Sequence, residues 1–357
     1  MEELRPPGST PLVSVVVVNY NGADAIEACL QALGWQHSEP ETEVLVVDNA
    51  SVDGSRELAE RAAAEADSMR VLASPTNRGY AGAVNLALEH ARGAYVAVLN
   101  MDITVEPGWL GPLVRFLEAN PNTGAVCPLI LLEGGPERIN AAGQDIHVTA
   151  LGFNRWLGEP RGRAGVEPIE VSGLHGGAFV IRRELLDRLG GWDERGFLYA
   201  EDVQLSMLVR LIGADIHCIP TSIVRHSYHL TMHPEKLFLL ERNRGWTVLT
   251  DLRGRTRLAL APLLALTELM MWGYCLLRGP AFLRAKARTY RWLAAHRVDL
   301  HERRRLVASI RRRSDWQLLR RLRWGYAWRQ FITLGRERGI SERTQIPNEA
   351  ERAAAGR

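Results

Sequence analysis

Acidic residues stand beside apolar segments at two places in the sequence, and both are candidates for chemistry. Asn100-Met101-Asp102 directly follows the apolar run Tyr95–Leu99. A carboxylate at the end of a strand can hold Mg²⁺ or Mn²⁺ together with phosphate oxygens. Glu201-Asp202 precedes the amphipathic segment Leu205–Ile212. A carboxylate there can serve as a general base toward a hydroxyl group, although adjacent acids also suit the dipole of a following helix.

Histidines near residue 230 are the remaining candidates for metal binding. His226 lies in the polar segment Arg225–His229, and His233 follows it. Histidine is a natural metal ligand, yet a single histidine is more often structural. A zinc site formed by these histidines is disfavoured, because Pro234 follows and the HExxH pattern is absent.

The elements that must position these residues alternate in type over the first hundred residues. Continuous β-branched runs such as Val13–Val18 predict strands buried on both faces. Strands are predicted at 13–18, 43–47, 70–73 and 95–99, and helices at 24–33, 53–67 and 81–91. This alternation predicts a parallel sheet flanked by helices, whose ligands lie at the carboxyl ends of the strands. Those ends are all polar: Asn19–Gly22, Asp48–Ser51, Ser74–Gly79 and Asn100–Asp102.

Regularity continues past the fourth strand and then weakens. We predict a helix at 107–120 and a strand at 126–131, followed by an irregular segment rich in Gly, Pro and Arg at 133–170. A strand at 177–181, a helix at 183–189 and the amphipathic helix at 205–212 come next.

Taken together, the ordered series of motifs from Pro11 to Arg244 resembles family 2 glycosyltransferases. The motifs are Val13–Gly22, Val46–Ser51 with Asp53-Gly54-Ser55, Asn77–Gly82 with Asn85, Leu99–Asp102, Gly190–Glu194, Tyr199–Val203 and Arg225-His226. The resemblance is greatest to bacterial rhamnosyltransferase-like enzymes of surface-polysaccharide assembly, many of which share Asn100 as the first residue of the metal motif. Gln204 departs from the pattern, since an acid is frequent at that position, and this concerns substrate detail.

The resemblance implies an α/β fold of the GT-A type, which is a Rossmann-like, mostly parallel sheet flanked by helices, with an α-helical C-terminal region. It implies an inverting, metal-dependent transfer of a sugar from a nucleotide-diphosphate donor, such as dTDP-rhamnose or a UDP-sugar, to a saccharide or polyprenyl-linked acceptor. Asp202 would be the base, with Glu201 positioning that carboxylate or the acceptor. Asp102 would bind Mg²⁺ or Mn²⁺, with His226 as a second contact to the metal or the phosphate.

The same resemblance assigns the binding residues. The nucleotide sugar would contact Asn19, Tyr20, Asn21, Asp48, Asn77, Gly79, Asn85, Asn100 and Asp102. His175, Gly176, Gly177 and Trp192 would shape the sugar or acceptor pocket, where paired glycines permit close backbone approach.

Composition bears on the partner and the compartment. The four cysteines are isolated, and Met1–Pro11 has no apolar core, so we expect a reducing, cytoplasmic environment without a signal peptide. Leu258–Leu277 is apolar except for Thr267 and Glu268, and it is interrupted by Pro262. It could lie on a membrane, span it, or form a buried helix. Arginines and tryptophans follow this segment, which favours the anionic inner face of the plasma membrane, although solvated helices would also accommodate them.

We therefore expect a catalytic domain at 11–245, a basic helical region at 246–345 that contacts a membrane, and tails at 1–10 and 346–357. A Rossmann dehydrogenase is excluded, because no GxGxxG follows the first strand. No RNA-binding motif accompanies the basic residues, so we expect no nucleic acid partner. A non-catalytic protein that binds sugar nucleotides or polysaccharide remains the alternative. The sequence does not indicate an oligomeric state.

Overall fold

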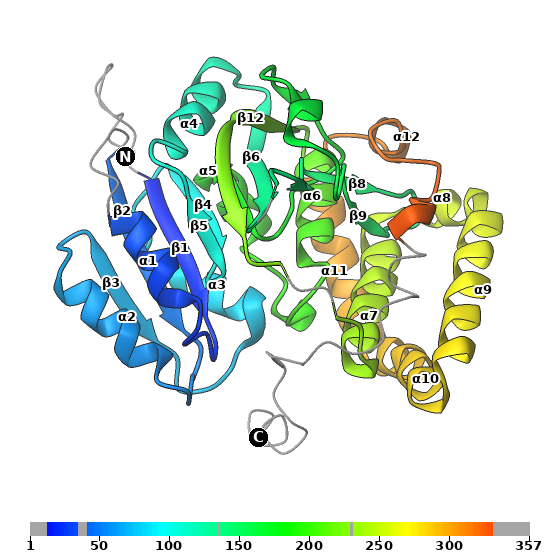
Figure 1. The fold of residues 1–357 in the computed structure, drawn as a ribbon. Coiled ribbons are helices and arrows are strands. Elements are labelled where there is room, and N and C mark those ends of the chain that lie inside the picture. Colours follow the sequence, from blue (N-terminus) through cyan, green and yellow to red (C-terminus); the bar gives the residue numbers. More distant parts are fainter. Residues whose placement is uncertain (1–12, 35–40, 135, 229–230, 331–357) are drawn as a thin grey trace.

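The computed structural model describes residues 13–34, 41–134, 136–228 and 231–330. A central sheet has the strand order β10-β12-β6-β11-β4-β1-β2-β3, with β5 paired to β12 and β7 paired to β6 (Figure 1). These strands are β1 (Val13–Asn19), β2 (Thr42–Asp48), β3 (Met69–Ala73), β4 (Tyr95–Asn100), β5 (Ile103–Val105), β6 (Thr123–Leu132), β7 (Ile139–Ala141), β10 (Ile169–Glu170), β11 (Ala178–Arg182) and β12 (Asp215–His226). A separate hairpin pairs β8 (Gln144–Ile146) with β9 (Gly152–Asn154).

Helices cover both faces of the sheet and extend beyond one edge. Six α-helices belong to the part of the described chain before residue 212: α1 (Ile26–Gly34), α2 (Ser55–Ala64), α3 (Gly79–His90), α4 (Leu110–Ala119), α5 (Arg183–Leu189) and α6 (Glu201–Leu211). The later ones are α7 (Pro234–Asp251), α8 (Gly254–Ala259), α9 (Ala261–Arg278), α10 (Pro280–Ala295), α11 (Arg297–Ile310) and α12 (Asp315–Leu319). Short 3₁₀ turns lie at η1 (Arg161–Ala164) and η2 (Glu194–Gly196).

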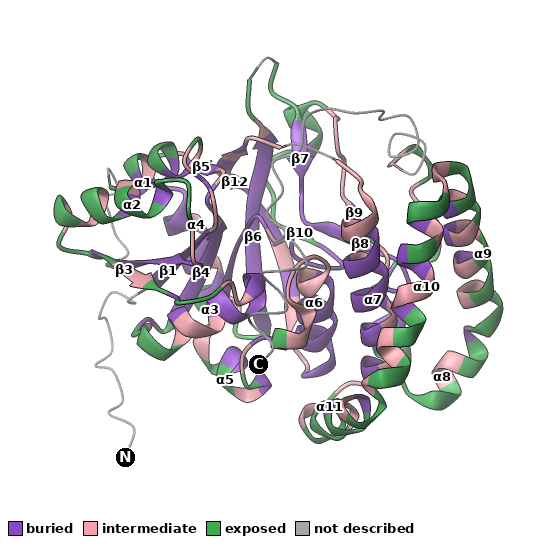
Figure 2. Cartoon of the chain, turned by 90° about the horizontal axis from the view of Figure 1, so that it is seen from below, coloured by how far each residue is buried: buried purple, intermediate pink, exposed green. Residues whose placement is uncertain are grey.

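The alternation of side chains along β1 creates two separate cores. All seven residues of β1 are buried. Val13, Val15 and Val17 pack toward α1, α2 and α4 on one face. Val16 and Val18 pack toward α3, α5 and α6 on the other, and Figure 2 shows the buried strands between these layers. A strand that is covered on both faces needs a continuous apolar sequence, which explains the run of valines.

The α/β architecture with a helical C-terminal region is confirmed. Strands β3, β2, β1 and β4 run parallel to one another, as predicted. β11 is instead antiparallel to both β4 and β6, so the purely parallel arrangement does not continue across the sheet. In-register pairing of Asn19 with Asp48, and of Val18 with Asn100, brings the polar carboxyl ends of β1, β2 and β4 to one edge.

Several predicted boundaries need correction. The predicted helix at 107–120 begins only at Leu110, and the segment 133–170 contains short strands rather than being irregular throughout. The strand β12 was not predicted. α7 runs across residue 245, so the predicted boundary between a catalytic domain and a helical region falls inside a helix, and this division stays a prediction. The predicted tails at 1–10 and 346–357 lie outside the described residues.

Candidate active site

Asp102 and His226 meet at the carboxyl end of β4. Asp102 follows β4, and His226 is the last residue of β12, where it pairs with Ile103 of β5. Its Nε2 lies 3.3 Å from Asp102 Oδ1. The other ring nitrogen, Nδ1, lies 2.9 Å from Asn140 Oδ1 in the buried strand β7. A proton on Nδ1 that is donated to Asn140 leaves the Nε2 lone pair directed at the carboxylate.

This pair fits a divalent cation. Asp102 Oδ1 is buried and accepts no hydrogen bond within the described part of the chain. Two ligands of one ion lie about 3 Å apart when each bond is about 2.1 Å, which agrees with the spacing of Oδ1 and Nε2. Among the described residues, no group of three or more His, Cys, Asp or Glu side chains is arranged to hold a metal ion by itself. Such an ion would therefore take its remaining ligands from the diphosphate and water, as Mg²⁺ usually does.

Glu201 and Asp202 begin α6, on the edge of a pocket of about 360 Å³. Asp202 Oδ2 accepts hydrogen bonds from the backbone N–H of Gly176 at 2.9 Å and from Gln144 Nε2 at 2.7 Å. Oδ1 accepts one from the N–H of Val203 at 2.8 Å. These bonds fix the orientation of the carboxylate. Glu201 Oε2 is buried and has no hydrogen-bond partner among the described residues.

Burial and like charge perturb the titration of this pair. Burial raises the pKa of Glu201, and the neighbouring Asp202 raises it further. Burial also raises the pKa of Asp202, against the hydrogen bonds from Gly176, Val203 and Gln144 that lower it. Two carboxyl groups in such a site share a proton more readily than they both ionise. An acid whose pKa is moved toward neutrality is suited to accept a proton from a hydroxyl group.

The large pocket joins the two acidic sites. Asn100, His175, Gly176, Gly177, Glu201, Asp202 and His226 all line it. Burial, and then the charge of His226, lower the pKa of His175 to about 3, so this ring is neutral and contributes shape and a hydrogen-bond acceptor. Its Nδ1 accepts the N–H of Gly177 at 3.0 Å. The wall formed by α7 and α9 is mixed: the apolar residues Leu237, Leu240 and Met271 line it together with Tyr274 and the charged residues Lys236, Glu241 and Arg244.

A smaller pocket of about 40 Å³ lies at the carboxyl ends of β1, β2 and β4. Four residues of the predicted nucleotide-sugar set line it, namely Tyr20, Asn77, Gly79 and Asn100, and their contact with a nucleotide stays a prediction. Gly79 has a positive φ of 71°, and a Cβ there would lie 2.4 Å from the carbonyl oxygen of Phe197. Only glycine therefore permits this close approach between the turn at Asn77–Gly79 and the segment before Glu201. Tyr80 and Asn100 line both pockets.

Other predicted residues lie behind the pockets. Asp48 and Asn19 are fully buried, and Asn19 Nδ2 donates to Asp48 Oδ1 at 3.0 Å. Asn21 Oδ1 accepts the N–H of Val52 at 2.9 Å, which ties the first two loops together. Asn85 exchanges two hydrogen bonds with the backbone of Trp192, whose ring packs near Phe179 in the core. Direct contact of these residues with a substrate stays a prediction.

The loop before Glu201 is strained and is held by α7. Phe197, Tyr199 and Ala200 have φ angles of 55°, 68° and 59°, a region that non-glycine residues rarely adopt. Asn243 Nδ2 donates to the carbonyl oxygens of Gly196, Leu198 and Tyr199 at 2.7, 3.1 and 2.6 Å. We name Gly196–Ala200 the catalytic loop, because it connects the small pocket to Glu201.

Sequence reasoning missed several residues that organise the site. Tyr80 was available within the motif Asn77–Gly82, and its hydroxyl donates to Gly176 at 3.1 Å. Asn140 and Gln144 lie in a segment that was interpreted as irregular, so no strand pattern marked them. Asn243 is a buried amide on a helix, and no local pattern connects it to a loop more than forty residues earlier. His229, one of the three histidines weighed for zinc, lies outside the described residues.

The sequence of this chain is similar to those of known proteins. Residues 14–190 match the model of glycosyl transferase family 2. The chain is 29% identical over 271 residues to N-acetylglucosaminyl-diphospho-decaprenol L-rhamnosyltransferase of Mycobacterium tuberculosis, covering 66% of this chain and 87% of that protein.

Two solved structures share the fold. A mannosyltransferase from Pyrobaculum calidifontis, in complex with GDP-Man and Mn²⁺, has a TM-score of 0.53 at 21% identity, covering 93% of this chain and 86% of that one. GalNAc-T7, with UDP, GalNAc and Mn²⁺, has a TM-score of 0.58 at 20% identity, covering 69% of this chain and 49% of that one.

Proposed function

The chain is a glycosyltransferase of the GT-A fold whose residues 14–190 belong to family 2, and we propose that it transfers a sugar with inversion from a nucleotide-diphosphate donor to a hydroxyl group of a lipid-linked saccharide. The observation that carries this proposal is the placement of His226, Glu201 and Asp202 around one pocket, with Asp102 paired to His226. The donor side then faces the carboxyl ends of β1, β2 and β4, and the acceptor side faces α6 and α7.

In this mechanism, the hydroxyl oxygen of the acceptor attacks the anomeric carbon of the donor sugar, and Asp202 accepts the proton of that hydroxyl. The nucleoside diphosphate leaves from the opposite side of the sugar. Gly176, Val203 and Gln144 hold the carboxylate in place. Glu201 positions the acceptor with its unpartnered oxygen. A divalent cation, Mg²⁺ or Mn²⁺, held by Asp102 and His226 would neutralise charge on the leaving diphosphate.

The relatives suggest candidate substrates. The mycobacterial relative is named for transfer of L-rhamnose to N-acetylglucosaminyl-diphospho-decaprenol. We therefore propose dTDP-rhamnose as the first donor to test, with UDP-sugars as the second choice, and a polyprenyl-diphosphate saccharide as the acceptor. This chemistry would place the enzyme in cell-surface polysaccharide synthesis, at the cytoplasmic face of the plasma membrane.

A screen of sugar nucleotides by thermal unfolding tests the donor. A ligand at 100 times its Kd stabilises the native state by about 2.7 kcal/mol, which corresponds to a rise in Tm of about 4 °C for a chain of this size. The expected result is a rise with one sugar nucleotide that depends on Mn²⁺ or Mg²⁺. Donor binding without sugar transfer to any acceptor would favour the non-catalytic alternative.

A further inference from the structure

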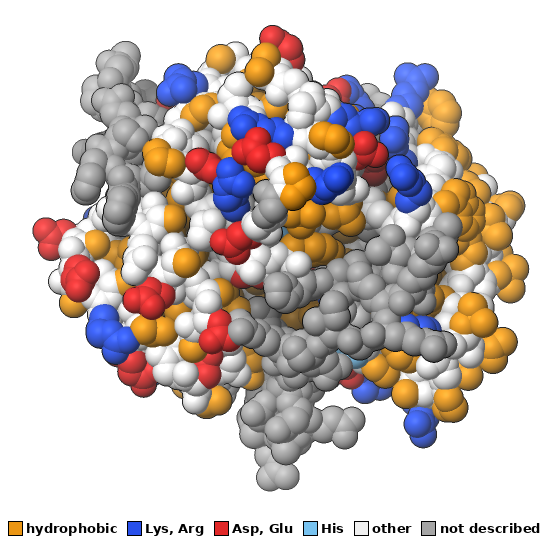
Figure 3. Space-filling model, in the orientation of Figure 1, with side chains coloured by type: hydrophobic (Ala, Val, Ile, Leu, Met, Phe, Trp, Pro, Cys, Tyr) orange, Lys and Arg blue, Asp and Glu red, His pale blue; other side chains and the backbone are white. Residues whose placement is uncertain are grey.

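Helix α9 carries its apolar side chains on the outside of the protein. Its exposed residues are all apolar or glycine: Ala261, Pro262, Ala265, Leu266, Leu269, Gly273, Leu276 and Leu277. Leu269, Leu276 and Leu277 are 70%, 69% and 89% exposed, and Leu258 extends the stripe onto α8. Figure 3 shows hydrophobic side chains gathered along the edge over α9. We name this stripe the α9 face. Contiguous exposed apolar surface of this kind marks an interaction site.

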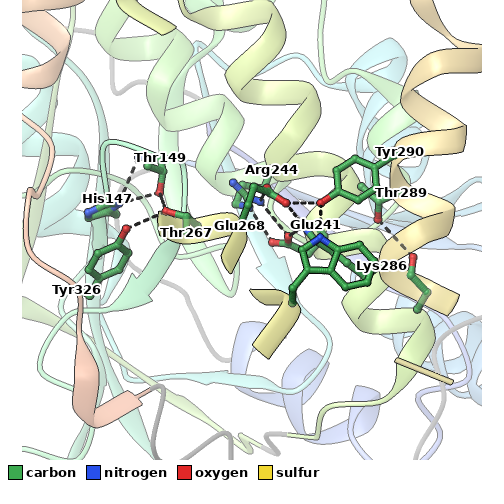
Figure 4. A network of polar contacts seen from close by, with 12 residues as sticks. His147, Thr149, Glu241, Arg244, Thr267, Glu268, Lys286, Thr289, Tyr290 and Tyr326 are labelled. Atoms are coloured by element: carbon green, nitrogen blue, oxygen red, sulfur yellow. Dashed lines mark hydrogen bonds and ion pairs between the residues drawn. The ribbon is translucent and has the colours of Figure 1, made fainter. Parts of the chain in front are cut away.

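Thr267 and Glu268 of α9 contact the rest of the protein while the exposed side chains are apolar, which is the reverse of an ordinary surface helix. Thr267 is fully buried, and its hydroxyl bonds to Thr149 and Tyr326 at 3.1 and 2.8 Å. Glu268 forms ion pairs with Arg244 and Lys286, and Figure 4 shows this network between α7, α9 and α10. These contacts fix the rotation of the helix. Turning the leucines toward the core would separate Glu268 from Arg244 and Lys286, whose charges would lose this partner.

The charges around the α9 face are almost all positive. From Arg253 to Arg297 the sequence contains nine arginine and lysine residues, of which Lys286 is buried against Glu241, and a single acid, Glu268, which is paired with Arg244 and Lys286. Arg253 and Arg255 are exposed at one end of the face, and Arg284 is exposed at the other. Basic side chains beside an apolar helical stripe match an anionic bilayer, where each contributes about 1 kcal/mol of attraction near the surface.

The α9 face also lies on the back of the proposed acceptor pocket. Met271 and Tyr274 of the same helix line the 360 Å³ pocket that contains Glu201 and Asp202. None of the described helices is long and apolar enough to cross a membrane. A helix that lies in the plane of the bilayer would therefore place the pocket beside the headgroups, within reach of a lipid-linked hydroxyl.

We propose that the α9 face docks on an anionic lipid bilayer, with its leucines in the acyl boundary and the neighbouring Arg253, Arg255 and Arg284 at the headgroups. A second copy of the chain fits this face less well. In a two-fold dimer the same patches meet, so the basic ends of α9 would face basic residues in either orientation. Docking itself does not depend on the transfer reaction, whereas delivery of the acceptor rests on the proposed function.

Cosedimentation of the full chain with vesicles, without donor or acceptor, tests docking apart from catalysis. The probes are vesicles of phosphatidylcholine alone and of phosphatidylcholine with phosphatidylglycerol. We expect binding to the anionic vesicles that weakens but persists at high salt, because the apolar contribution is not screened. Leu269→Gln/Leu276→Gln should lower the partition coefficient at least about tenfold. The matched control Val166→Gln/Val298→Gln changes valines that are 67% and 66% exposed, and it should stay within about twofold of the wild type.

Three results would overturn the proposal. The first is absence of binding to anionic vesicles at low salt, and the second is equal binding to neutral vesicles. The third is equal loss of binding in the leucine variant and its control. Sedimentation velocity addresses the competing occupant, since a wild-type dimer that the leucine variant dissociates would assign the α9 face to a second copy.

Discussion

Asn243 should control turnover although it lies outside both pockets. Its amide nitrogen has two hydrogens and contacts three carbonyl oxygens of the catalytic loop. Two hydrogen bonds contribute about 2 kcal/mol together, since each is worth about 1 kcal/mol net. They oppose the cost of three non-glycine residues at positive φ in the same loop, each of which costs about 1 kcal/mol or more. Asn243→Ala should therefore lower the population of the competent loop, and with it kcat, by about 30-fold.

Steady-state kinetics together with urea unfolding measure this effect. Thr250→Ala is the matched control, because Thr250 is also buried on α7. Its hydroxyl donates to the carbonyl oxygen of Trp246 at 2.9 Å and lies 2.7 Å from Asp251 Oδ1, and the variant loses both contacts. It should lower the free energy of unfolding but leave kcat nearly unchanged. Asn243→Asp should be worse than Asn243→Ala, since a carboxylate would face three carbonyl oxygens. If Asn243→Ala retains the wild-type kcat, or if Thr250→Ala loses as much, the catalytic loop does not depend on this amide.

The remaining predictions concern the acids. Asp202→Asn should lower kcat by about 10²–10⁴-fold with donor affinity nearly unchanged. Glu201→Gln should have a milder effect on kcat or should mainly raise the KM for the acceptor. If Glu201→Gln lowers kcat more than Asp202→Asn does, the base would be reassigned to Glu201. Asp102→Ala should abolish the dependence of nucleotide-diphosphate affinity on Mn²⁺ in calorimetry, and unchanged metal dependence would show that Asp102 is not a ligand. Because the pKa values of Glu201 and Asp202 are raised, kcat/KM should fall as pH decreases through the raised values, and Glu201→Gln should move this limb to lower pH. The native pair binds more protons than the unfolded chain, so the stability of the wild type relative to Glu201→Gln should decline as pH rises. A pH profile that is identical in the variant would contradict the coupling.

Local sequence patterns predicted the first hundred residues of the fold well, because each element there is defined by its own neighbours. A continuous run of β-branched valines favours a strand covered on both faces, and the polar residues at the ends of parallel strands then meet at one edge. The register of β1 with β2 and β4 confirms this for Asn19, Asp48 and Asn100.

The part of the site around Glu201, Asp202 and His226 depends on contacts between segments that are distant in the sequence, which local patterns do not reveal. Asn140 orients His226, Gln144 binds Asp202, and Asn243 holds the catalytic loop. The glutamate of Leu258–Leu277 illustrates the same limit. In the sequence, Glu268 is a charge that weakens an apolar segment, and only its ion pair with Lys286 of α10 shows that it faces inward.

Acceptor-dependent release of nucleoside diphosphate by the purified full chain tests the central claim most directly. With the donor identified by thermal unfolding and a polyprenyl-diphosphate saccharide as acceptor, we expect release that requires a divalent metal, with an inverted anomeric configuration in the product by NMR. Asp202→Asn should bind the donor with wild-type affinity and release almost none. A product of retained configuration, or full turnover in the presence of a chelator, would contradict the account.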